Sequence, residues 1–322
     1  MESPIFIFSL PRSGSTLLQR VLMTDPNICS VAEPWLLLPQ LYSLKKEGVV
    51  SEFSSLTAQQ AIGDFIDNLP NKQIDYNISL NSFISDLYSK QCKNNERYFL
   101  DKTPRYYLII NEIAEVFPNA KFIFLFRNPL HIFASIIETW GNKSISKIHR
   151  NSRDLTEGFN ALSNGYKIHK ERSISVNYED FVNYPEIELK KISNYLDLKI
   201  DSEVLKDFSK QDTKGELGDP TGAKRYKSIS KEGLDKWKNT LNASFRKKIV
   251  INLFKKIDDI SFSLQGYDKQ DIIKDLKAID NRNNKYIVKD FFDYNKSRLI
   301  SMLKLNLMLR KEYLWFRKRF IS

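Results

Sequence analysis

The sequence contains few residues of the kinds that build metal centres or disulfide-rich scaffolds. Its 322 residues include two cysteines, Cys29 and Cys92, and three histidines, and the cysteines have no metal-ligand spacing around them. Disulfide-stabilised domains are much richer in cysteine than this chain. We therefore expect neither a zinc site nor a disulfide framework, and a reducing compartment is the default expectation.

We expect neither a leader peptide nor a membrane-spanning helix in this sequence. An apolar segment with the pattern of a strand begins at residue 4, which leaves no room before it for a charged region, an apolar region and a cleavage site. Near the other end, the apolar run 299–309 includes Lys304 and is far shorter than the roughly 20 apolar residues that a helix needs to span a bilayer. A cytoplasmic protein is expected.

Basic charge is concentrated at the carboxyl end of the chain. The formal net charge is +11, but residues 1–150 hold 15 Lys and Arg against 14 Asp and Glu, whereas residues 296–322 hold eight basic residues against Glu312 alone. No nucleic-acid-binding module is recognisable, so no nucleic acid partner is expected. The basic tail has two interpretations: a terminal helix packed on the body or on a partner chain, and an amphipathic helix in peripheral contact with the inner membrane face.

The order of apolar and helical patterns predicts an α/β fold. Short apolar runs are typical of strands that are buried on both faces, and here they alternate with segments of helical periodicity, which favours a P-loop-like parallel sheet flanked by helices. We expect an α/β domain over residues 1–265 and a helical, basic extension over 266–322. The expected strands are 4–10, 28–32, 98–101, 121–126 and 174–177, and the expected helices are 15–23, 107–117, 130–139, 154–170, 185–196 and a pair within 231–256. Residues 40–95 and 268–295 are too mixed to assign.

The turn after the first strand, in LPRSGSTLL, predicts an anion at a helix amino terminus. The phosphate-loop signature of nucleotide hydrolases requires Gly-Lys-Ser/Thr, which is absent here. Arg12 and the backbone amides of residues 13–17 would face the anion, where the helix dipole supplies about half a positive charge, and Gly14 permits close approach of the backbone. The alternative is that Arg12 is a surface residue in an ordinary turn. The residues concerned are Arg12, Ser13, Gly14, Ser15, Thr16 and Leu17.

A second strand-loop-helix unit carries Arg127 and Ser135. Arg127 follows the expected strand 121–126, and Ser135 lies eight residues further along, in the next expected helix. An arginine with a hydroxyl can hold a second, separate phosphate. Each residue alone also fits a structural role, as an ion pair at a helix start or as a serine on a helix face. Because both motifs occur in the correct order, with Lys102-Thr103-Pro104 between them, a ligand with two phosphates is favoured.

The segments LPRSGSTLL, DKTPRY, FIFLFRNPLHIFAS and VNYEDFVNYPE, in this order, resemble the sulfotransferase superfamily that uses 3′-phosphoadenosine 5′-phosphosulfate (PAPS). The resemblance covers residues 3–240 and is nearer to tyrosylprotein and bacterial carbohydrate sulfotransferases than to the cytosolic phenol and steroid enzymes. It implies that residues 11–17 bind the 5′-phosphosulfate and that Arg127 and Ser135 bind the 3′-phosphate. It also implies that Tyr178 lies near the adenine, with simple packing at a strand end as the alternative.

A later loop resembles the segment that closes over the cofactor in this superfamily. The match rests on Lys224 and Arg225, which precede an Ile-Ser pair and Trp237. These two residues are expected to contact the cofactor, and a solvated basic loop is the alternative.

The resemblance also implies a catalytic set. Sulfuryl transfer needs in-line attack and stabilisation of charge on the leaving phosphate, so positioning and electrostatics dominate. Lys102 matches the lysine that stabilises the leaving oxygen, and Arg12 stands where many members carry a lysine. Pro104 replaces the histidine base of the cytosolic enzymes, so Glu33 is expected to be the base, with a surface salt bridge or a helix cap as its alternative. Arg105 is expected to hold the acceptor or the sulfonate.

The expected activity is transfer of a sulfuryl group from PAPS, without a metal ion, to a hydroxyl or amine of a glycan, glycolipid, protein or small molecule. A kinase that uses the first loop for ATP is a rival, disfavoured because Arg127 stands where a metal-binding aspartate would follow the strand. A non-catalytic nucleotide-binding protein of the same fold is a second rival, disfavoured by the presence of both Lys102 and Glu33. The sequence does not indicate the acceptor, whose pocket is expected within residues 42–95 and the helices after residue 139.

Overall fold

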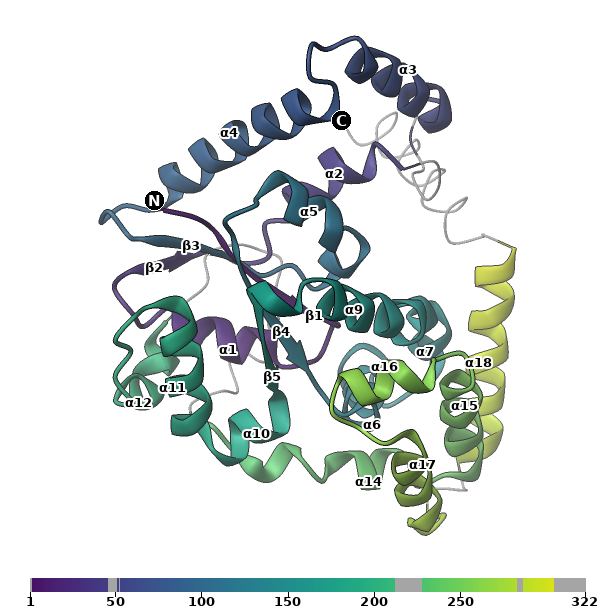
Figure 1. Cartoon of the computed structure of the whole chain (residues 1–322). Helices are drawn as coiled ribbons and strands as arrows, with labels where there is room; N and C mark the ends of the chain where they lie inside the picture. The colour runs from purple at the N-terminus through teal and green to yellow at the C-terminus, as the bar shows by residue number, and fades with distance from the viewer. Residues whose placement is uncertain (1, 46–50, 52, 212–227, 283–285, 304–322) are drawn as a thin grey trace, which may run out of the picture. The chain divides into compact units, whose positions relative to one another are not determined.

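The computed structural model describes residues 2–45, 51, 53–211, 228–282 and 286–303 (Figure 1). The chain divides into two compact units: the first comprises residues 1–127 and 161–231, and the second comprises residues 128–160 and 232–322. The predicted domain boundary after residue 265 stays a prediction. Within the described ranges, no helix is both long and apolar enough to cross a membrane. Most of the basic tail, residues 304–322, lies outside the described residues.

The first unit contains a parallel sheet of five strands in the order β2-β3-β1-β4-β5. The strand β1 lies at the centre and is buried along its whole length, with Phe6 opposite Phe122. Continuous apolar runs such as IFIFS and KFIFLF suit this position, because a central parallel strand has no solvent-facing side. The predicted α/β class, with a central parallel sheet flanked by helices, is confirmed. The strands are β1 Ile5–Ser9, β2 Ile28–Ser30, β3 Tyr98–Asp101, β4 Lys121–Phe126 and β5 Ser173–Asn177.

Helices cover both faces of this sheet (Figure 1). The chain leaves β1 toward β2 through α1 (Ser15–Leu22) and crosses from β3 to β4 through α5 (Ile110–Val116). Because parallel crossovers are right-handed and these two run in opposite directions across the sheet, α1 and α5 lie on opposite faces. On the α5 face the carboxyl-terminal part of α9 (Glu157–Ile168) packs closely, since a Cβ added at Gly165 would lie 2.5 Å from Ile110 Cδ1.

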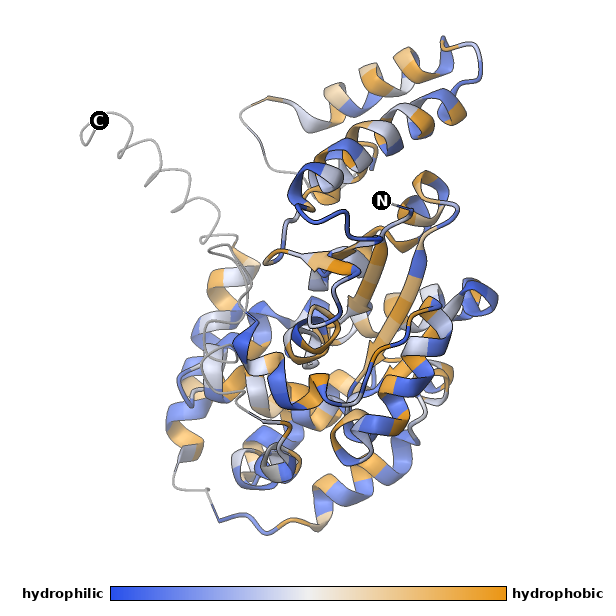
Figure 2. Ribbon diagram, turned by 90° about the vertical axis from the view of Figure 1, so that its left-hand side faces the viewer, coloured by the Kyte–Doolittle hydropathy of each residue, from blue (hydrophilic) through white to orange (hydrophobic). Residues whose placement is uncertain are grey.

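Aromatic side chains fill the core beside the central strands. The ring of Phe8 lies 5.0 Å from that of Phe122 and 5.2 Å from that of Phe124, centroid to centroid, and the rings of Phe6 and Phe117 are 5.5 Å apart. The strands are accordingly drawn mainly in the hydrophobic colour in Figure 2. Burying a phenylalanine contributes about 1.5–3 kcal/mol, so these rings fix the strands that carry the residues at their carboxyl ends.

The remaining helices of the first unit include those that the sequence left unassigned. Residues 107–117, expected as one helix, form the end of a 3₁₀ helix followed by α5, because Pro104 starts a tight turn straight after β3. The helix expected over 185–196 is confirmed as α11. The further helices are α2 Leu37–Tyr42, α3 Ser55–Asp67, α4 Gln73–Gln91, the 3₁₀ helix Pro104–Leu108, α10 Tyr178–Asn183, α11 Pro185–Leu196 and α12 Val204–Asp207.

Every regular element in the described part of the second unit is a helix. The helix expected over 130–139 is α-helical only to Ser135 and continues as a π-helical turn, and the helix expected over 154–170 is interrupted at Thr156, whose backbone leaves the helical region. Buried Arg246 binds both carboxylate oxygens of Asp290, at 2.6 and 3.1 Å, and so joins α15 to α18. The helices described in the second unit include α6 Pro129–Ser135, the π turn Ile136–Trp140, α7 Ser146–Arg150, α8 Ser152–Leu155, the start of α9, α14 Lys236–Thr240, α15 Ser244–Phe254, α16 Asp259–Leu264, α17 Lys269–Ala278 and α18 Ile287–Met302.

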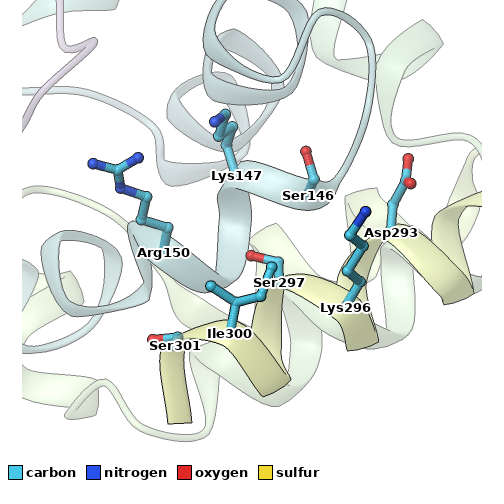
Figure 3. A pocket seen from close by; sticks show the side chains of 8 residues that line it. All are labelled: Ser146, Lys147, Arg150, Asp293, Lys296, Ser297, Ile300 and Ser301. Atoms are coloured by element: carbon cyan, nitrogen blue, oxygen red, sulfur yellow. The ribbon is translucent and has the colours of Figure 1, made fainter. Parts of the chain in front are cut away.

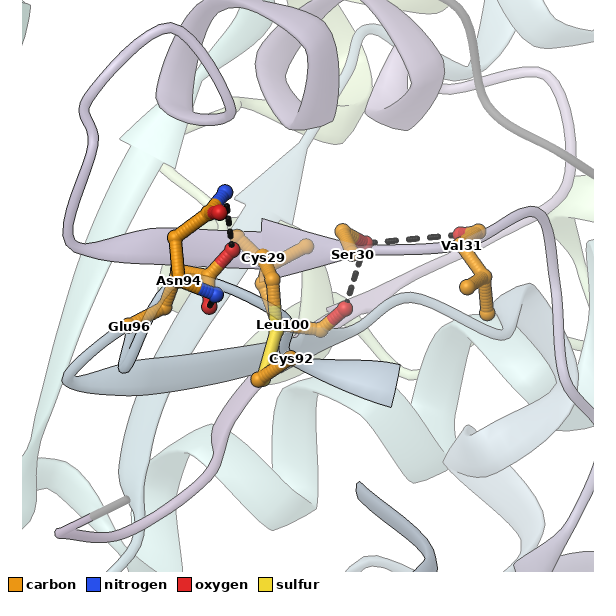
Figure 4. Close-up of a disulfide and its surroundings, with 7 residues drawn as sticks. All are labelled: Cys29, Ser30, Val31, Cys92, Asn94, Glu96 and Leu100. Atoms are coloured by element: carbon orange, nitrogen blue, oxygen red, sulfur yellow. Dashed lines mark hydrogen bonds between the residues drawn. A yellow bond between two sulfur atoms is a disulfide. The ribbon is translucent and has the colours of Figure 1, made fainter. Parts of the chain in front are cut away.

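The two cysteines form a disulfide (Figure 4). Cys29 lies in β2 and Cys92 follows α4, with a sequence separation of 63 residues and a Cα–Cα distance of 5.7 Å. The sequence predicted no disulfide framework and did not predict this one bridge, which forms because the fold returns the end of α4 to the strand that carries Cys29. Glu96 lies near the two sulfur atoms, but a disulfide offers no thiolate to a metal ion.

Candidate active site

A tight turn between β1 and α1 presents the amino terminus of α1. In this turn Arg12 and Gly14 have φ angles of +69° and +89°, in the left-handed region that favours glycine. Two amides that were expected to face an anion are already bonded, because Ser13 and Leu17 donate to main-chain carbonyls at 3.3 and 3.0 Å. Within the described chain, the amides of residues 14–16 have no main-chain acceptor. These amides and the dipole of α1 fit an anion.

Arg127, which follows β4, holds this turn in place. Its Nη1 donates to the carbonyl oxygen of Arg12 at 2.8 Å, and its guanidinium carbon lies 4.1 Å from the centroid of the Tyr178 ring. The same ring lies against Gly14, where an added Cβ would be 2.3 Å from Tyr178 Cε2. The structure thus brings together four predicted cofactor residues at the carboxyl ends of β1, β4 and β5.

Two buried donors in this cluster have no protein partner among the described residues. The Nε of Arg127 and the Oγ of Ser13 are both inaccessible, and the two residues are only 8% and 1% exposed. Buried polar groups in proteins are almost always hydrogen-bonded. The two donors therefore fit the oxygen atoms of an anionic ligand.

A buried ion pair lies where β2 and β3 end. Lys102 Nζ is 2.9 Å from Glu33 Oε1, and the lysine side chain is 1% exposed whereas that of Glu33 is 15% exposed. Lys102 follows β3 directly and Glu33 comes three residues after β2, so neighbouring parallel strands deliver both side chains to one edge of the sheet. The ammonium group is also 3.5 Å from Thr16 Oγ1 in α1. The pair therefore lies beside the turn that fits an anion.

Arg105 and Trp35 extend this pair. The guanidinium carbon of Arg105 lies 5.9 Å from the centroid of the Trp35 ring. The indole Nε1 of Trp35 donates to Glu33 Oε2 at 3.3 Å. The two oxygens of Glu33 thus have different partners, Lys102 on one side and Trp35 on the other.

Asp101, the last residue of β3, is a buried carboxylate that the sequence motifs do not single out. It accepts hydrogen bonds from the hydroxyls of Tyr88, Tyr106 and Thr103 at 2.6, 2.9 and 3.2 Å. Burial raises the pKa of Asp101 to about 6, an increase that these hydrogen bonds and the charge of Lys102 oppose. The sequence signal that could have indicated it is an acidic residue closing an otherwise apolar strand, YFLD.

Three further residues were predicted to bind the cofactor: Ser135, Lys224 and Arg225. Ser135 is the last residue of α6 and belongs to the second unit, whereas Arg127 belongs to the first. Lys224 and Arg225 lie outside the described residues. Their expected contacts with a cofactor remain predictions.

A cavity of about 300 Å³ lies in the second unit, between α7 and α18 (Figure 3). Lys147 and Arg150 line it from α7, and Asp293 and Lys296 line it from α18. In Figure 3 the side chains of the three basic residues diverge rather than converge on one point. None of the residues predicted for the active site lines this cavity.

Known proteins resemble this chain in sequence. A sequence model of the Sulfotransferase family matches residues 4–202. A putative protein-tyrosine sulfotransferase of Caenorhabditis briggsae is 25% identical over 281 residues, which are 83% of this chain and 90% of that protein. The nodulation protein NoeE of Sinorhizobium fredii strain NGR234 is 33% identical over 147 residues, which are 44% of this chain but only a third of NoeE's length, 33%.

Solved structures show the same fold. The sulfotransferase domain of the Synechococcus PCC 7002 olefin synthase superposes with a TM-score of 0.53 at 24% identity, covering 79% of this chain and 95% of that domain. The residues matched by the family model include all five strands, the turn before α1 and the Lys102–Glu33 pair, and they make up more than half of the chain. The chain therefore belongs to the sulfotransferase family of enzymes.

Proposed function

We propose that this protein transfers a sulfuryl group from PAPS to a hydroxyl or amine of an acceptor, with Glu33 as general base and Lys102 stabilising the leaving group. The observation that carries the proposal is the Lys102–Glu33 pair, 2.9 Å apart and buried beside the anion-fitting turn. A base and a cation held this closely can act on the two oxygens between which a sulfuryl group moves.

The first unit has groups that suit the phosphates of PAPS. The amides of residues 14–16 and the buried hydroxyl of Ser13 would hold the 5′-phosphosulfate, and the free Nε of Arg127 would hold the 3′-phosphate. Arg127 is an apt choice because a guanidinium can stack on Tyr178 and donate from its edge at the same time. Ser135, Lys224 and Arg225 are proposed as further ligands of the same cofactor. No metal ion takes part in this proposal.

The chemistry assigned to the protein is proton transfer and charge stabilisation. Bound PAPS supplies a sulfuryl group on a phosphate leaving group. Glu33 accepts the proton of the acceptor as the new bond to sulfur forms, and Lys102 donates a hydrogen bond to the oxygen of the breaking bond. Arg12 adds positive charge at the same end of the sheet, and Arg105 contacts the acceptor or the sulfonate.

Labelling of candidate acceptors identifies the acceptor class. Several relatives are protein-tyrosine sulfotransferases by name, so a tyrosine-containing peptide is a rational first probe. Lipid, glycan and small-molecule fractions of a cell extract, each incubated with ³⁵S-labelled PAPS, provide the comparison. The fraction that gains label identifies the acceptor class.

Pelleting with anionic liposomes, with and without residues 296–322, tests the peripheral membrane contact, and equal pelleting would contradict it.

Ligand-dependent stability tests the nucleotide assignment. The desulfonated cofactor, 3′,5′-adenosine diphosphate (PAP), should stabilise the protein by about 2.7 kcal/mol at a hundredfold excess over its Kd. ATP with Mg²⁺ should give much less, because it lacks the 3′-phosphate that Arg127 would bind. Stabilisation by ATP with Mg²⁺ alone would favour a kinase, and stabilisation by PAP without any sulfuryl transfer would indicate a non-catalytic nucleotide-binding protein.

A further inference from the structure

Glu33 lies on a short segment that has no regular secondary structure of its own. It belongs to residues 31–36, which connect β2 to α2, and α2 begins at Leu37. Within this connection Trp35 has a φ angle of +55°, a conformation that a residue with a side chain rarely adopts and that the surroundings must enforce. The position of Glu33 therefore depends on what holds residues 35–37.

Two hydroxyl groups hold this segment by its main chain. The amide of Trp35 donates to Thr103 Oγ1 at 3.3 Å, and the amide of Leu37 donates to the hydroxyl of Tyr106 at 3.3 Å. Thr103 and Tyr106 are both completely buried. Neither amide has an acceptor within α2, because Trp35 precedes the helix and Leu37 is its first residue. The two hydroxyls therefore accept hydrogen bonds from amides that the helix leaves without an acceptor.

Both hydroxyls donate hydrogen bonds to Asp101. Thr103 Oγ1 donates to Asp101 Oδ1 at 3.2 Å, and the hydroxyl of Tyr106 donates to Asp101 Oδ2 at 2.9 Å. An ionised carboxylate can only accept hydrogen bonds, whereas a hydroxyl has one proton to give and lone pairs left over. Because Asp101 accepts the hydrogen bond of each hydroxyl, the oxygen lone pairs of Thr103 and Tyr106 are oriented toward the two amides.

We propose that Asp101 is a positioning residue for Glu33, and that it acts through Thr103 and Tyr106 on the main chain of residues 35–37. The inference rests on the proposed function, in which Glu33 is the base. The indole of Trp35 completes the path, because its Nε1 donates to Glu33 Oε2 and therefore carries the position of the main chain to the carboxylate. A charged residue next to Lys102 thus orients the base without touching substrate.

Tyr88 offers a matched control within the same network. Its hydroxyl donates to Asp101 Oδ2 at 2.6 Å, but it belongs to α4 and its ring stacks on Phe99 at 4.1 Å between centroids. Among the described residues it makes no hydrogen bond to the segment 33–37. Tyr88→Phe therefore removes a buried hydrogen bond of the same kind as Tyr106→Phe and leaves both connections to the segment in place.

Amide hydrogen exchange measures the positioning directly and needs no acceptor. Thr103→Val should speed the exchange of the Trp35 amide, and Tyr106→Phe should speed that of the Leu37 amide, by tenfold or more each. Tyr88→Phe should change neither by more than about twofold. Thr103→Ser, which keeps the hydroxyl, should restore protection of Trp35. Unchanged exchange in both Thr103→Val and Tyr106→Phe would overturn the inference whatever the activity of the enzyme.

Turnover then tests the consequence for the base. With ³⁵S-labelled PAPS and the acceptor fraction used by the wild type, Thr103→Val and Tyr106→Phe should lower kcat by about 10- to 100-fold while the Kd for PAP stays within about twofold, because a misplaced reacting group costs rate rather than donor binding. Tyr88→Phe should keep its kcat. An equal loss of kcat in Tyr88→Phe would reduce Asp101 to a structural role. If the wild type transfers no sulfuryl group while the exchange results hold, the proposed function fails and the positioning of the segment stands.

Discussion

Replacing Glu33 by glutamine isolates the charge of the proposed base from its shape. The carboxylate is held by Lys102 at 2.9 Å and by the indole of Trp35 at 3.3 Å. A glutamine fills the same volume and still offers an oxygen to Lys102, but it cannot take a proton from the acceptor. We expect Glu33→Gln to fold, to bind PAP and to lose turnover.

The size of each effect follows from the burial of the pair. Removing one partner of a buried ion pair costs about 3–5 kcal/mol, but the amide of glutamine remains an acceptor and Glu33 is 15% exposed, so a loss of about 1–3 kcal/mol in unfolding free energy is expected. A positioned general base contributes on the order of 10²–10⁴-fold in rate. This loss of kcat corresponds to about 2.7–5.4 kcal/mol of activation free energy, compared with about 1–3 kcal/mol of stability.

Three measurements on one preparation decide this prediction. Urea unfolding gives the stability, calorimetry with PAP gives the donor affinity, and transfer from ³⁵S-labelled PAPS gives kcat. Glu112→Gln is a suitable control, because it breaks a half-exposed ion pair with Lys45 and should cost about 0–1 kcal/mol and no activity. A Glu33→Gln enzyme with kcat within tenfold of the wild type would refute the assignment of Glu33 as base.

The remaining predictions concern the turn, the buried carboxylate and the disulfide. Gly14→Ala places a Cβ 2.3 Å from the Tyr178 ring at a φ of +89°; it should weaken PAP binding at least tenfold by calorimetry and cost about 1–3 kcal/mol, whereas Gly63→Ala, with no atom within 4 Å, should not destabilise α3. Burial raises the pKa of Asp101 from 3.8 to about 6, so its protonation favours the folded state; this contribution is complete below about pH 4 and is lost as the pH rises through about 6. Relative to Asp101→Asn, the wild type should therefore lose about 3 kcal/mol of unfolding free energy between about pH 4 and pH 7 in urea titrations, and a constant difference would contradict the raised pKa. Reducing the disulfide that closes 63 residues should cost up to about 4 kcal/mol by loop entropy, and an unchanged Tm in dithiothreitol would show that the two thiols are not joined.

The parts of the fold that sequence could predict are those that depend on local pattern. The strands β1 and β4 are short, nearly continuous apolar runs, so Lys121–Phe126 was predicted at its observed bounds. The meeting of Glu33 and Lys102 also follows from pattern, since both come just after strands of a parallel sheet and such residues gather at one edge.

The parts that sequence could not predict depend on contacts between distant segments. The helix α4 carries apolar residues on both sides, with Ile84 buried but Ile74 and Ile78 more than half exposed, so its periodicity is blurred. The disulfide joins cysteines 63 residues apart that no spacing rule connects. Asp101 likewise gains its role only where Tyr88 meets it from α4 and Tyr106 meets it from the 3₁₀ helix after β3.

The activity proposed for this chain is sulfuryl transfer in which Lys102 stabilises the leaving group. Its most direct test is the transfer of ³⁵S from labelled PAPS to a cell extract by the wild type and by Lys102→Ala, with PAP affinity measured for both. We expect labelled product with the wild type and a loss of at least a hundredfold with Lys102→Ala, whose PAP affinity falls much less. No labelled product with a wild-type protein that binds PAP, or equal transfer by the two proteins, would contradict it.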